Sequence, residues 1–172
     1  MAIFATKTKS NMNYDNSTVR RQDRLLSEER AAAILRDGEY GFLALGGEGG
    51  YGIPVNFAAE EEHIYMHCAP EGEKLRRIAS DNRASFCVVG RTAPKPQQFT
   101  TEYESVMLFG RISMVADDTE RMHALSLIIN KYSPEYTEAG LKYAEKSFHR
   151  TAVLRLDIER ASGKCKSLAN RR

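Results

Sequence analysis

His67, Cys68, Gly72 and Lys74 bring several kinds of chemistry into one short segment of the chain. An imidazole can donate a hydrogen bond or transfer a proton near neutral pH. A thiol is a nucleophile once it is ionised. A lysine ammonium at the start of a helix favours phosphate, because the unpaired backbone N–H groups and the helix dipole also attract anions there. The segment therefore predicts an anion site with Lys74 as its full positive charge.

Two strands and a short helix are expected to position these side chains. Apolar and polar residues in 53–58 and 64–68 are arranged as in a hairpin. Leu75 and Ile78, one helical turn apart, predict a helix from Gly72 to Ser80. The strand that ends near His67 would thus run directly into the helix that begins at the anion site.

The other segments predict a mainly β protein. We expect a helix from Ser27 to Gly38, a longer helix from Asp117 to Tyr132, and a polar loop with room for one helical turn over 133–149. Further strands are expected at 41–45, 84–89, 103–115 and 152–159, with a bulge or bend at Gly110. Because strands predominate without a regular βαβ alternation, we predict a small antiparallel barrel of around six strands with peripheral helices.

Length and composition are those of one globular domain. The 172 residues are 42% hydrophobic and 28% charged, which excludes a fibrous or disordered chain. Residues 1–18 hold few apolar anchors and predict a flexible N-terminal arm, so the domain is expected to span 19–172.

Charge and cysteine content limit which partners and which cellular compartment are expected. The net charge of +2 gives no overall field for nucleic acid or a membrane surface, and the basic pairs lack interleaved aromatic residues. The sequence holds no apolar run of membrane-spanning length and no secretory signal. Three separated cysteines cannot form a closed set of disulfides, so we expect a reducing, cytoplasmic location.

Other motifs have plainer explanations. The glycine cluster at 47–52 matches the dinucleotide fingerprint, but Pro54 and the flanking strands favour a hairpin tip. His63 and His67 would stand roughly 13 Å apart on a strand, so we expect no metal site. Cys68 has no base spaced to activate it and is expected to be a buried thiol. Ser105 would be a phosphate ligand only beside Lys74.

An ordered series of blocks resembles the 5-nitroimidazole resistance (Nim) proteins of the pyridoxamine 5'-phosphate oxidase-like, flavin-binding split-barrel superfamily. The blocks span about residues 19–165, and their order is more specific than any one of them. The resemblance rests on Val19–Arg24, Tyr40–Ala44, Ile53–Phe57, Ile64–His67, Gly72–Lys74 and Tyr103–Gly110. The chain has no Trp, whereas true pyridoxamine phosphate oxidases carry a C-terminal Trp and Arg motif, so the Nim branch is favoured.

The resemblance implies a homodimer of six-stranded split barrels with flavin between the subunits. Lys74 and Ser105 would meet the phosphate of FMN, and the ring or ribityl chain would be lined by Val55, Asn56, His67, Cys68 and Ala69. Tyr103 and Val106 lie in the same motif and are further candidates. FAD is a possible replacement for FMN, with its adenylate outside the barrel.

The activity implied is flavin-mediated reduction of a nitro compound to the amine, with His67 as the candidate proton or hydrogen-bond donor. Two alternatives stay open. One is a non-catalytic flavin- or haem-binding protein on the same barrel, and the other is an oxidase related to pyridoxamine phosphate oxidase.

Overall fold

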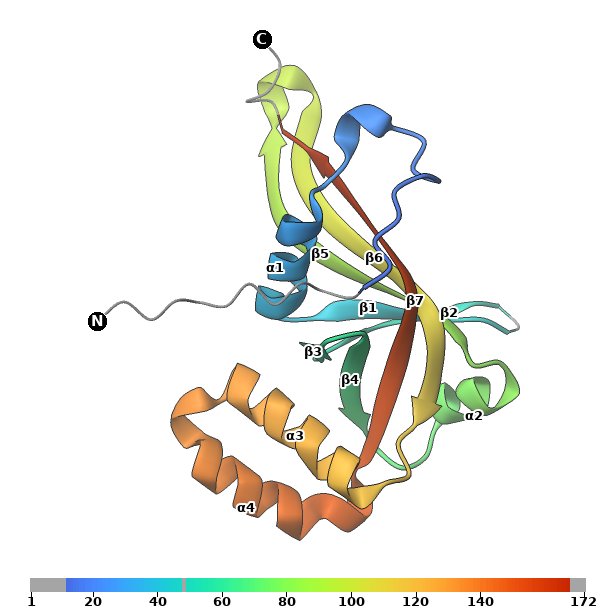
Figure 1. Cartoon of the computed structure of the whole chain (residues 1–172), viewed down its shortest axis with the longest axis vertical. Coiled ribbons are helices and arrows are strands. Elements are labelled where there is room, and N and C mark those ends of the chain that lie inside the picture. Colours follow the sequence, from blue (N-terminus) through green and yellow to red (C-terminus); the bar gives the residue numbers. More distant parts are fainter. Residues whose placement is uncertain (1–11, 48, 168–172) are drawn as a thin grey trace.

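The computed structural model describes residues 12–47 and 49–167. Within these residues the chain forms seven strands, four α-helices and four 3-10 turns (Figure 1). The strands are β1 (Gly41–Leu45), β2 (Tyr51–Val55), β3 (Ala58–Glu60), β4 (His63–Cys68), β5 (Arg83–Lys95), β6 (Thr100–Met114) and β7 (Ala152–Lys166). The helices are α1 (Glu28–Asp37), α2 (Glu73–Ser80), α3 (Asp118–Tyr132) and α4 (Thr137–Ser147). The 3-10 turns are η1 (Gln22–Arg24), η2 (Pro96–Gln98), η3 (Pro134–Tyr136) and η4 (Phe148–Arg150).

All strand pairs in the sheet are antiparallel, and their order is β2-β1-β5-β6-β7-β4-β3. The mainly β class with an antiparallel barrel-like sheet and peripheral helices is therefore confirmed. The strand count differs slightly from the expected six, because the chain turns at Asn56 and Phe57 and divides the predicted strand 53–58 into β2 and β3.

One core explains why the sheet curves. Side chains from central strands, such as Leu43, Phe86 and Leu108, share a cluster with Met66 of β4 near one end of the sheet and with partly buried Val55 of β2 at the other. Since both ends of the sheet contribute to this core, the strands must wrap around it. The edge strands β2 and β3 are not hydrogen-bonded to each other, so the barrel stays open on that side.

The three long strands carry the curvature. Gly110 sits at a register shift between β6 and β7, as expected for a bulge. A Cβ at Gly110 would lie 1.9 Å from the Asp157 carbonyl oxygen, so only glycine allows the two strands to approach there. The structure extends the strand predicted at 152–159 to Lys166, because β6 offers it pairing partners as far as Tyr103.

The helices cover separate parts of the sheet. α3 and α4 form an antiparallel pair over a second core that includes Tyr65, Leu125 and Val153 (Figure 1). Asp117 caps α3, since its carboxylate accepts a hydrogen bond from the Glu120 backbone N–H at 2.8 Å. The prediction of a loop over 133–149 was wrong: these residues form η3, α4 and part of η4. α4 buries small residues rather than a large apolar stripe, which hid it in the sequence.

The described part of the N-terminal segment lies along β7. Met12 is buried, the Asp15 backbone N–H donates to the Ala161 carbonyl at 2.8 Å, and the Tyr14 hydroxyl donates to the Leu26 carbonyl at 2.8 Å. Residues 12–18 of the expected arm are thus packed on the domain, and the rest of that arm lies outside the described residues. No helix in the described ranges is long and apolar enough to cross a membrane.

Candidate functional site

His67, Cys68 and Lys74 lie together where β4 ends and α2 begins. His67 pairs with Val153 and Cys68 with Ala152 on β7, which fixes the end of β4. Successive residues of a strand face opposite sides of the sheet. Cys68 accordingly packs against the barrel core, whereas His67 lies on the other side and is exposed at its edge. The charge of Lys74 acts on both groups, so this part of the expected site is assembled within one chain.

The surroundings of His67 favour its neutral form. Although part of the ring is exposed, the protein packed around the rest of it lowers the pKa of His67 below its ordinary value, and the charge of Lys74 lowers that pKa further. Near neutral pH the ring then keeps one N–H donor and one nitrogen acceptor. It can give a hydrogen bond to a ligand without adding a positive charge.

Cys68 has the properties of a structural thiol. Burial raises its pKa, and the positive charge of Lys74 only partly offsets this effect. Burial likewise raises the pKa of Cys87 and of Cys165, and all three cysteines are free thiols. The thiolate fraction at neutral pH is therefore small, which argues against Cys68 as a nucleophile.

The start of α2 fits an anion. Gly72 has φ 126°, a conformation that favours glycine, and no atom lies within 4 Å of where its Cβ would be. No side chain caps the N-terminus of α2. Within the described ranges, Lys74 has no hydrogen bond or ion pair. Open space, uncapped N–H groups and an available ammonium are the donor set that a phosphate requires.

Three further residues of the expected site lie at the ends of β2 and β4. Val55 ends β2 opposite Gly41, and Asn56 donates from Nδ2 to the Glu39 carbonyl at 2.9 Å. Ala69 is exposed directly after β4. The structure thus leaves Asn56 and Ala69 accessible, while Val55 is half-buried against the core.

The β6 residues lie elsewhere. Ser105 pairs with Val89 on β5 and with Lys164 on β7, and Tyr103 is half-buried near the far end of the same strands. Val106 is 0% exposed in the core, so its side chain is closed to a ligand.

Ser105 and Lys74 are not brought together within one chain. β7 meets His67 at Val153 but meets Ser105 at Lys164. These two β7 positions are separated by about 36 Å of strand at roughly 3.3 Å per residue. Figure 1 shows β7 running from the end of β4 beside α3 toward the opposite end of the molecule. A single ligand phosphate could meet both residues only if they come from two copies of the chain.

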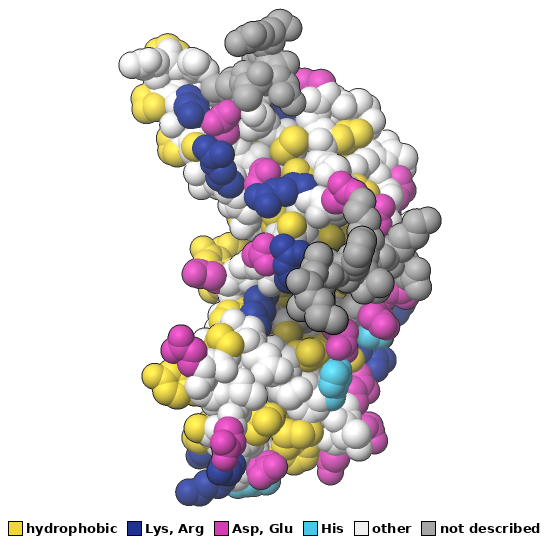
Figure 2. Space-filling model, turned by 60° about the vertical axis from the view of Figure 1, so that its left-hand side comes forward, with side chains coloured by type: hydrophobic (Ala, Val, Ile, Leu, Met, Phe, Trp, Pro, Cys, Tyr) yellow, Lys and Arg dark blue, Asp and Glu magenta, His cyan; other side chains and the backbone are white. Residues whose placement is uncertain are grey.

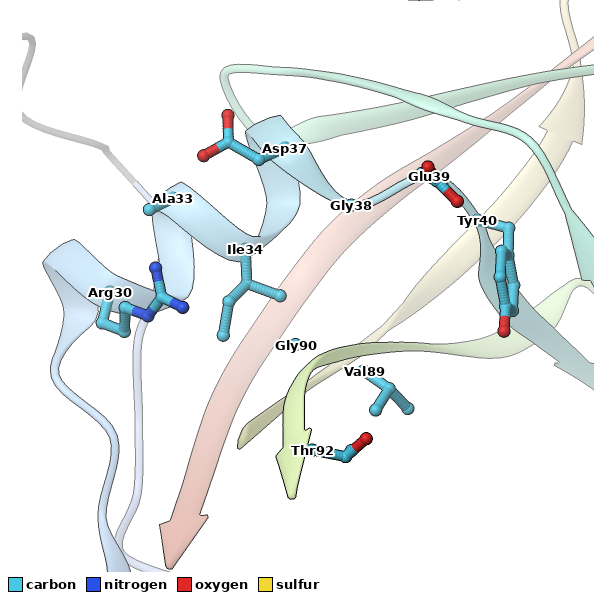
Figure 3. Close-up of a pocket in the computed structure, with 10 residues that line it drawn as sticks. All are labelled: Arg30, Ala33, Ile34, Asp37, Gly38, Glu39, Tyr40, Val89, Gly90 and Thr92. Atoms are coloured by element: carbon cyan, nitrogen blue, oxygen red, sulfur yellow. The ribbon is translucent and has the colours of Figure 1, made fainter. Parts of the chain in front are cut away.

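A pocket of about 380 Å³ lies between α1 and β5, close to Asn56 after β2 and to Ser105 on β6 (Figure 3). The Ile34 side chain points toward Gly90 across its floor, and a Cβ at Gly90 would lie 2.9 Å from Ile34 Cδ1. Arg30 at the rim donates to the Glu104 carboxylate at 2.7 Å, which lowers the pKa of Glu104. The residues that line the pocket are Arg30, Ala33, Ile34, Asp37, Gly38, Glu39, Tyr40, Val89, Gly90 and Thr92.

Sequence reasoning did not place this pocket. Glu39 joins it to Asn56 through the hydrogen bond described above, and Val89 joins it to Ser105 through strand pairing. Of the residues that line the pocket, only Tyr40 belongs to one of the sequence blocks on which the family resemblance rests. The pocket depends on α1 packing across the bulged part of β5, a nonlocal arrangement that no spacing in the sequence indicates.

His63 and His123 do not join the site. His63 Nδ1 lies 2.9 Å from Asp157 Oδ1, and His123 Nε2 lies 2.7 Å from Glu60 Oε2. Among residues 12–47 and 49–167 no group of three or more His, Cys, Asp and Glu side chains could hold a metal ion.

Residues 27–165 match the family model described as pyridoxamine 5'-phosphate oxidase. The chain belongs to this family. No curated protein matches the sequence. The fold is shared with solved members of several flavin-related groups, at identities that support the fold alone.

Three of these structures are informative. A protein proposed to confer 5-nitroimidazole antibiotic resistance in Bacteroides thetaiotaomicron is 21% identical, with a TM-score of 0.67 over 83% of this chain and 86% of that one. An FAD-binding protein from Mesorhizobium loti is 24% identical, with a TM-score of 0.61 over 84% and 98%. An FAD and haem binding protein from Mycobacterium smegmatis is 24% identical, with a TM-score of 0.68 over 84% and 73%.

Proposed function

We propose that this protein is a flavin-dependent reductase of nitro compounds that carries FMN and converts a nitro group to the amine. The observation that carries the proposal is the junction of β4 and α2, where His67 and Lys74 flank an uncapped helix start in a chain of the pyridoxamine 5'-phosphate oxidase family. The likeness to the proposed resistance protein from Bacteroides thetaiotaomicron favours nitroimidazoles as the substrate class.

Lys74 and the N–H groups at the start of α2 would hold the phosphate of FMN. The Lys74 charge and the dipole act in the same direction, so an anion gains from both. FAD would fit the same phosphate contacts, with its remaining half outside, and mass spectrometry of the released ligand distinguishes the two cofactors.

The protein's part in the reaction is to orient the substrate and to supply hydrogen bonds. A bound flavin would supply electrons in pairs, which avoids a free nitro radical. Reduction of a nitro group to an amine consumes six electrons and six protons and releases both oxygens as water, so an external two-electron reductant must replenish the flavin three times. His67, whose pKa is lowered, would stay neutral near pH 7 and would donate a hydrogen bond from its ring N–H to the substrate. The protons that the reaction consumes would come from solvent.

We further propose that the working unit is a homodimer in the cytoplasm. The outer face of the sheet exposes an apolar patch in which Tyr40 is 52%, Phe42 44% and Val89 47% exposed. Phe42 lies in one cross-strand row with Cys87 and Met107, whose side chains therefore share its face. Burial of this patch against a second copy would let Ser105 of one chain and Lys74 of the other meet the same flavin.

Binding of nucleic acid or of a membrane is not part of the proposal. On the face shown in Figure 2, dark blue and magenta side chains are interspersed and form no broad basic surface. The small polar-rimmed pocket in Figure 3 has the size of a site for a small aromatic substrate, which agrees better with a nitro compound.

A visible absorption spectrum of the purified protein, followed by anaerobic turnover, tests the proposal. We expect a flavin spectrum and conversion of a nitroimidazole to its amine when a reductant is supplied, with boiled protein and free FMN as controls. A haem spectrum would contradict the cofactor. Bound flavin without amine formation under any reductant would contradict the enzyme.

A further inference from the structure

A second cavity, of about 690 Å³, lies between the end of α1, the edge strand β3 and the C-terminal half of α3. Ala58, Ala59 and Leu127 give it apolar walls, and Lys131 and Tyr132 line it on the side of α3. None of these five residues lines the pocket of Figure 3. The cavity has the size of a site for a small organic molecule, and the proposed flavin chemistry does not use it.

Lys131 places its amine where lysines rarely place theirs. A lysine at the surface usually buries its aliphatic stem and keeps its ammonium group in water. Lys131 is partly exposed, yet its Nζ has almost no contact with solvent and no hydrogen-bond partner among the described residues. The Nζ atom lies 3.7 Å from the centre of the Phe57 ring and 5.5 Å from that of the Tyr132 ring. Because a buried ammonium without a partner is costly, this position favours the neutral amine.

The wall behind this amine is rigid. The Phe57 ring is 0% exposed and packs edge-on against Phe86, with 5.1 Å between the ring centres. The Tyr132 hydroxyl donates to the Glu39 carbonyl at 2.6 Å and accepts from the Phe57 backbone N–H at 3.0 Å. The amine of Lys131 thus lies against a fixed aromatic wall, and rotation about the bonds of its flexible four-carbon stem turns it into the cavity.

The charges around the cavity favour a neutral ligand. Arg36 donates to the Asp37 carboxylate at 2.7 and 2.8 Å, so this pair is neutral overall, and Glu39 is the other charged residue that lines the cavity with Lys131. Burial lowers the pKa of Lys131 to about 8, and the Asp37 carboxylate only partly offsets this effect. At pH 8 about half of this amine is then neutral, against less than about 1% for an ordinary lysine. A neutral, desolvated amine is a nucleophile.

We propose that this cavity is a covalent binding site for small apolar aldehydes, with Lys131 as its nucleophile. The Nζ lone pair attacks the carbonyl carbon, a C=N bond replaces the C=O bond, and the two amine hydrogens leave with the carbonyl oxygen as one water molecule. No electrons are gained or lost, so the step requires no oxidant or reductant. The site does not depend on bound flavin or on reductase activity.

Labelling with benzaldehyde tests the site. The protein is incubated with benzaldehyde at pH 8, sodium cyanoborohydride traps the imine, and peptide mass spectrometry locates the labelled lysines. Lys131 should be labelled about 10-fold faster than Lys142, which is 73% exposed on the neighbouring helix α4 and pairs with Glu138, because a solvated lysine is almost wholly protonated at this pH. The labelling rate of Lys131 should rise with pH and level off above about pH 8, and benzoate, an anion of the same size, should not slow it.

Two variants separate the cavity from the amine. Lys131→Met keeps an unbranched side chain and should abolish the label at this position. Ala59→Leu narrows the cavity without changing the amine and should slow the labelling of Lys131, while the labelling of Lys142 stays the same. Equal labelling of Lys131 and Lys142 in the wild type, protection of Lys131 by benzoate, or an unchanged rate in Ala59→Leu would overturn the proposal. A protein without flavin or reductase activity that still labels at Lys131 would overturn the proposed function alone.

Discussion

Replacement of Lys74 by alanine gives the sharpest test of the phosphate site. Lys74 lies in the first turn of α2 and has no hydrogen bond or ion pair in the described ranges, so its removal breaks no bond of these two kinds. Alanine is also the best helix former, so α2 should persist. Any change in cofactor affinity then reports on the contact with the ligand.

The size of the effect follows from the charge and burial of Lys74. A hydrogen bond to a charged partner contributes about 1.5–3 kcal/mol, and every 1.4 kcal/mol corresponds to about tenfold in affinity. Since Lys74 is half-buried, solvent screens part of its charge, and the lower half of this range applies. We expect Lys74→Ala to weaken FMN binding about 10- to 40-fold.

Riboflavin, which lacks the phosphate, makes the assay specific. Fluorescence titration should show that Lys74→Ala binds riboflavin as tightly as the wild type does. Arg76→Ala is the matched control, because Arg76 lies on the same helix, is 72% exposed and pairs with Glu73. Equal losses for FMN and riboflavin, or an equal loss in the Arg76 variant, would refute the phosphate assignment.

Three further outcomes are expected. The pKa of His67 in the folded state lies below 6.5, so the unfolded state binds more protons than the folded state once the pH falls below about 6.5. Urea unfolding should therefore show a loss of stability as the pH falls below about 6.5, and His67→Gln should show a smaller loss. Gly110→Ala should destabilise the fold by more than about 3 kcal/mol or prevent folding, as checked by thermal unfolding, because its Cβ would meet the Asp157 carbonyl at 1.9 Å. Phe42→Lys should convert the proposed dimer to a monomer in analytical ultracentrifugation, whereas Tyr143→Lys, at a position that is 66% exposed on α4, should not.

Local patterns in the sequence predicted much of the fold. The hairpin pattern around 64–68 and the spacing of Leu75 and Ile78 located β4 and α2, although β4 buries residues on both of its sides. α4 was missed because Ala144 and Ser147 are its buried residues, and small side chains give no periodic apolar signal. The length of β7 was missed because its second half is stabilised by pairing with β6 rather than by its own composition.

Part of the candidate site could likewise be predicted from the sequence, and part of it could not. His67 and Lys74 are close in the sequence, so a strand followed by a helix was enough to bring them together. The separation of Ser105 from Lys74 follows from the positions at which β4 and β6 pair along β7, which pattern alone does not define. The contact of Tyr132 with Glu39 joins residues that are 93 positions apart, and no local rule predicts it.

Glu39 takes part in that contact through its backbone carbonyl oxygen, and this matters for protein engineering. The Glu39 carbonyl accepts from both Tyr132 and Asn56, while the Glu39 side chain is exposed and lines the neighbouring pocket. Every amino acid supplies the same carbonyl. Position 39 can therefore be varied to reshape the pocket wall without disturbing the orientation of Asn56, which makes it the natural first position for a library aimed at new substrates.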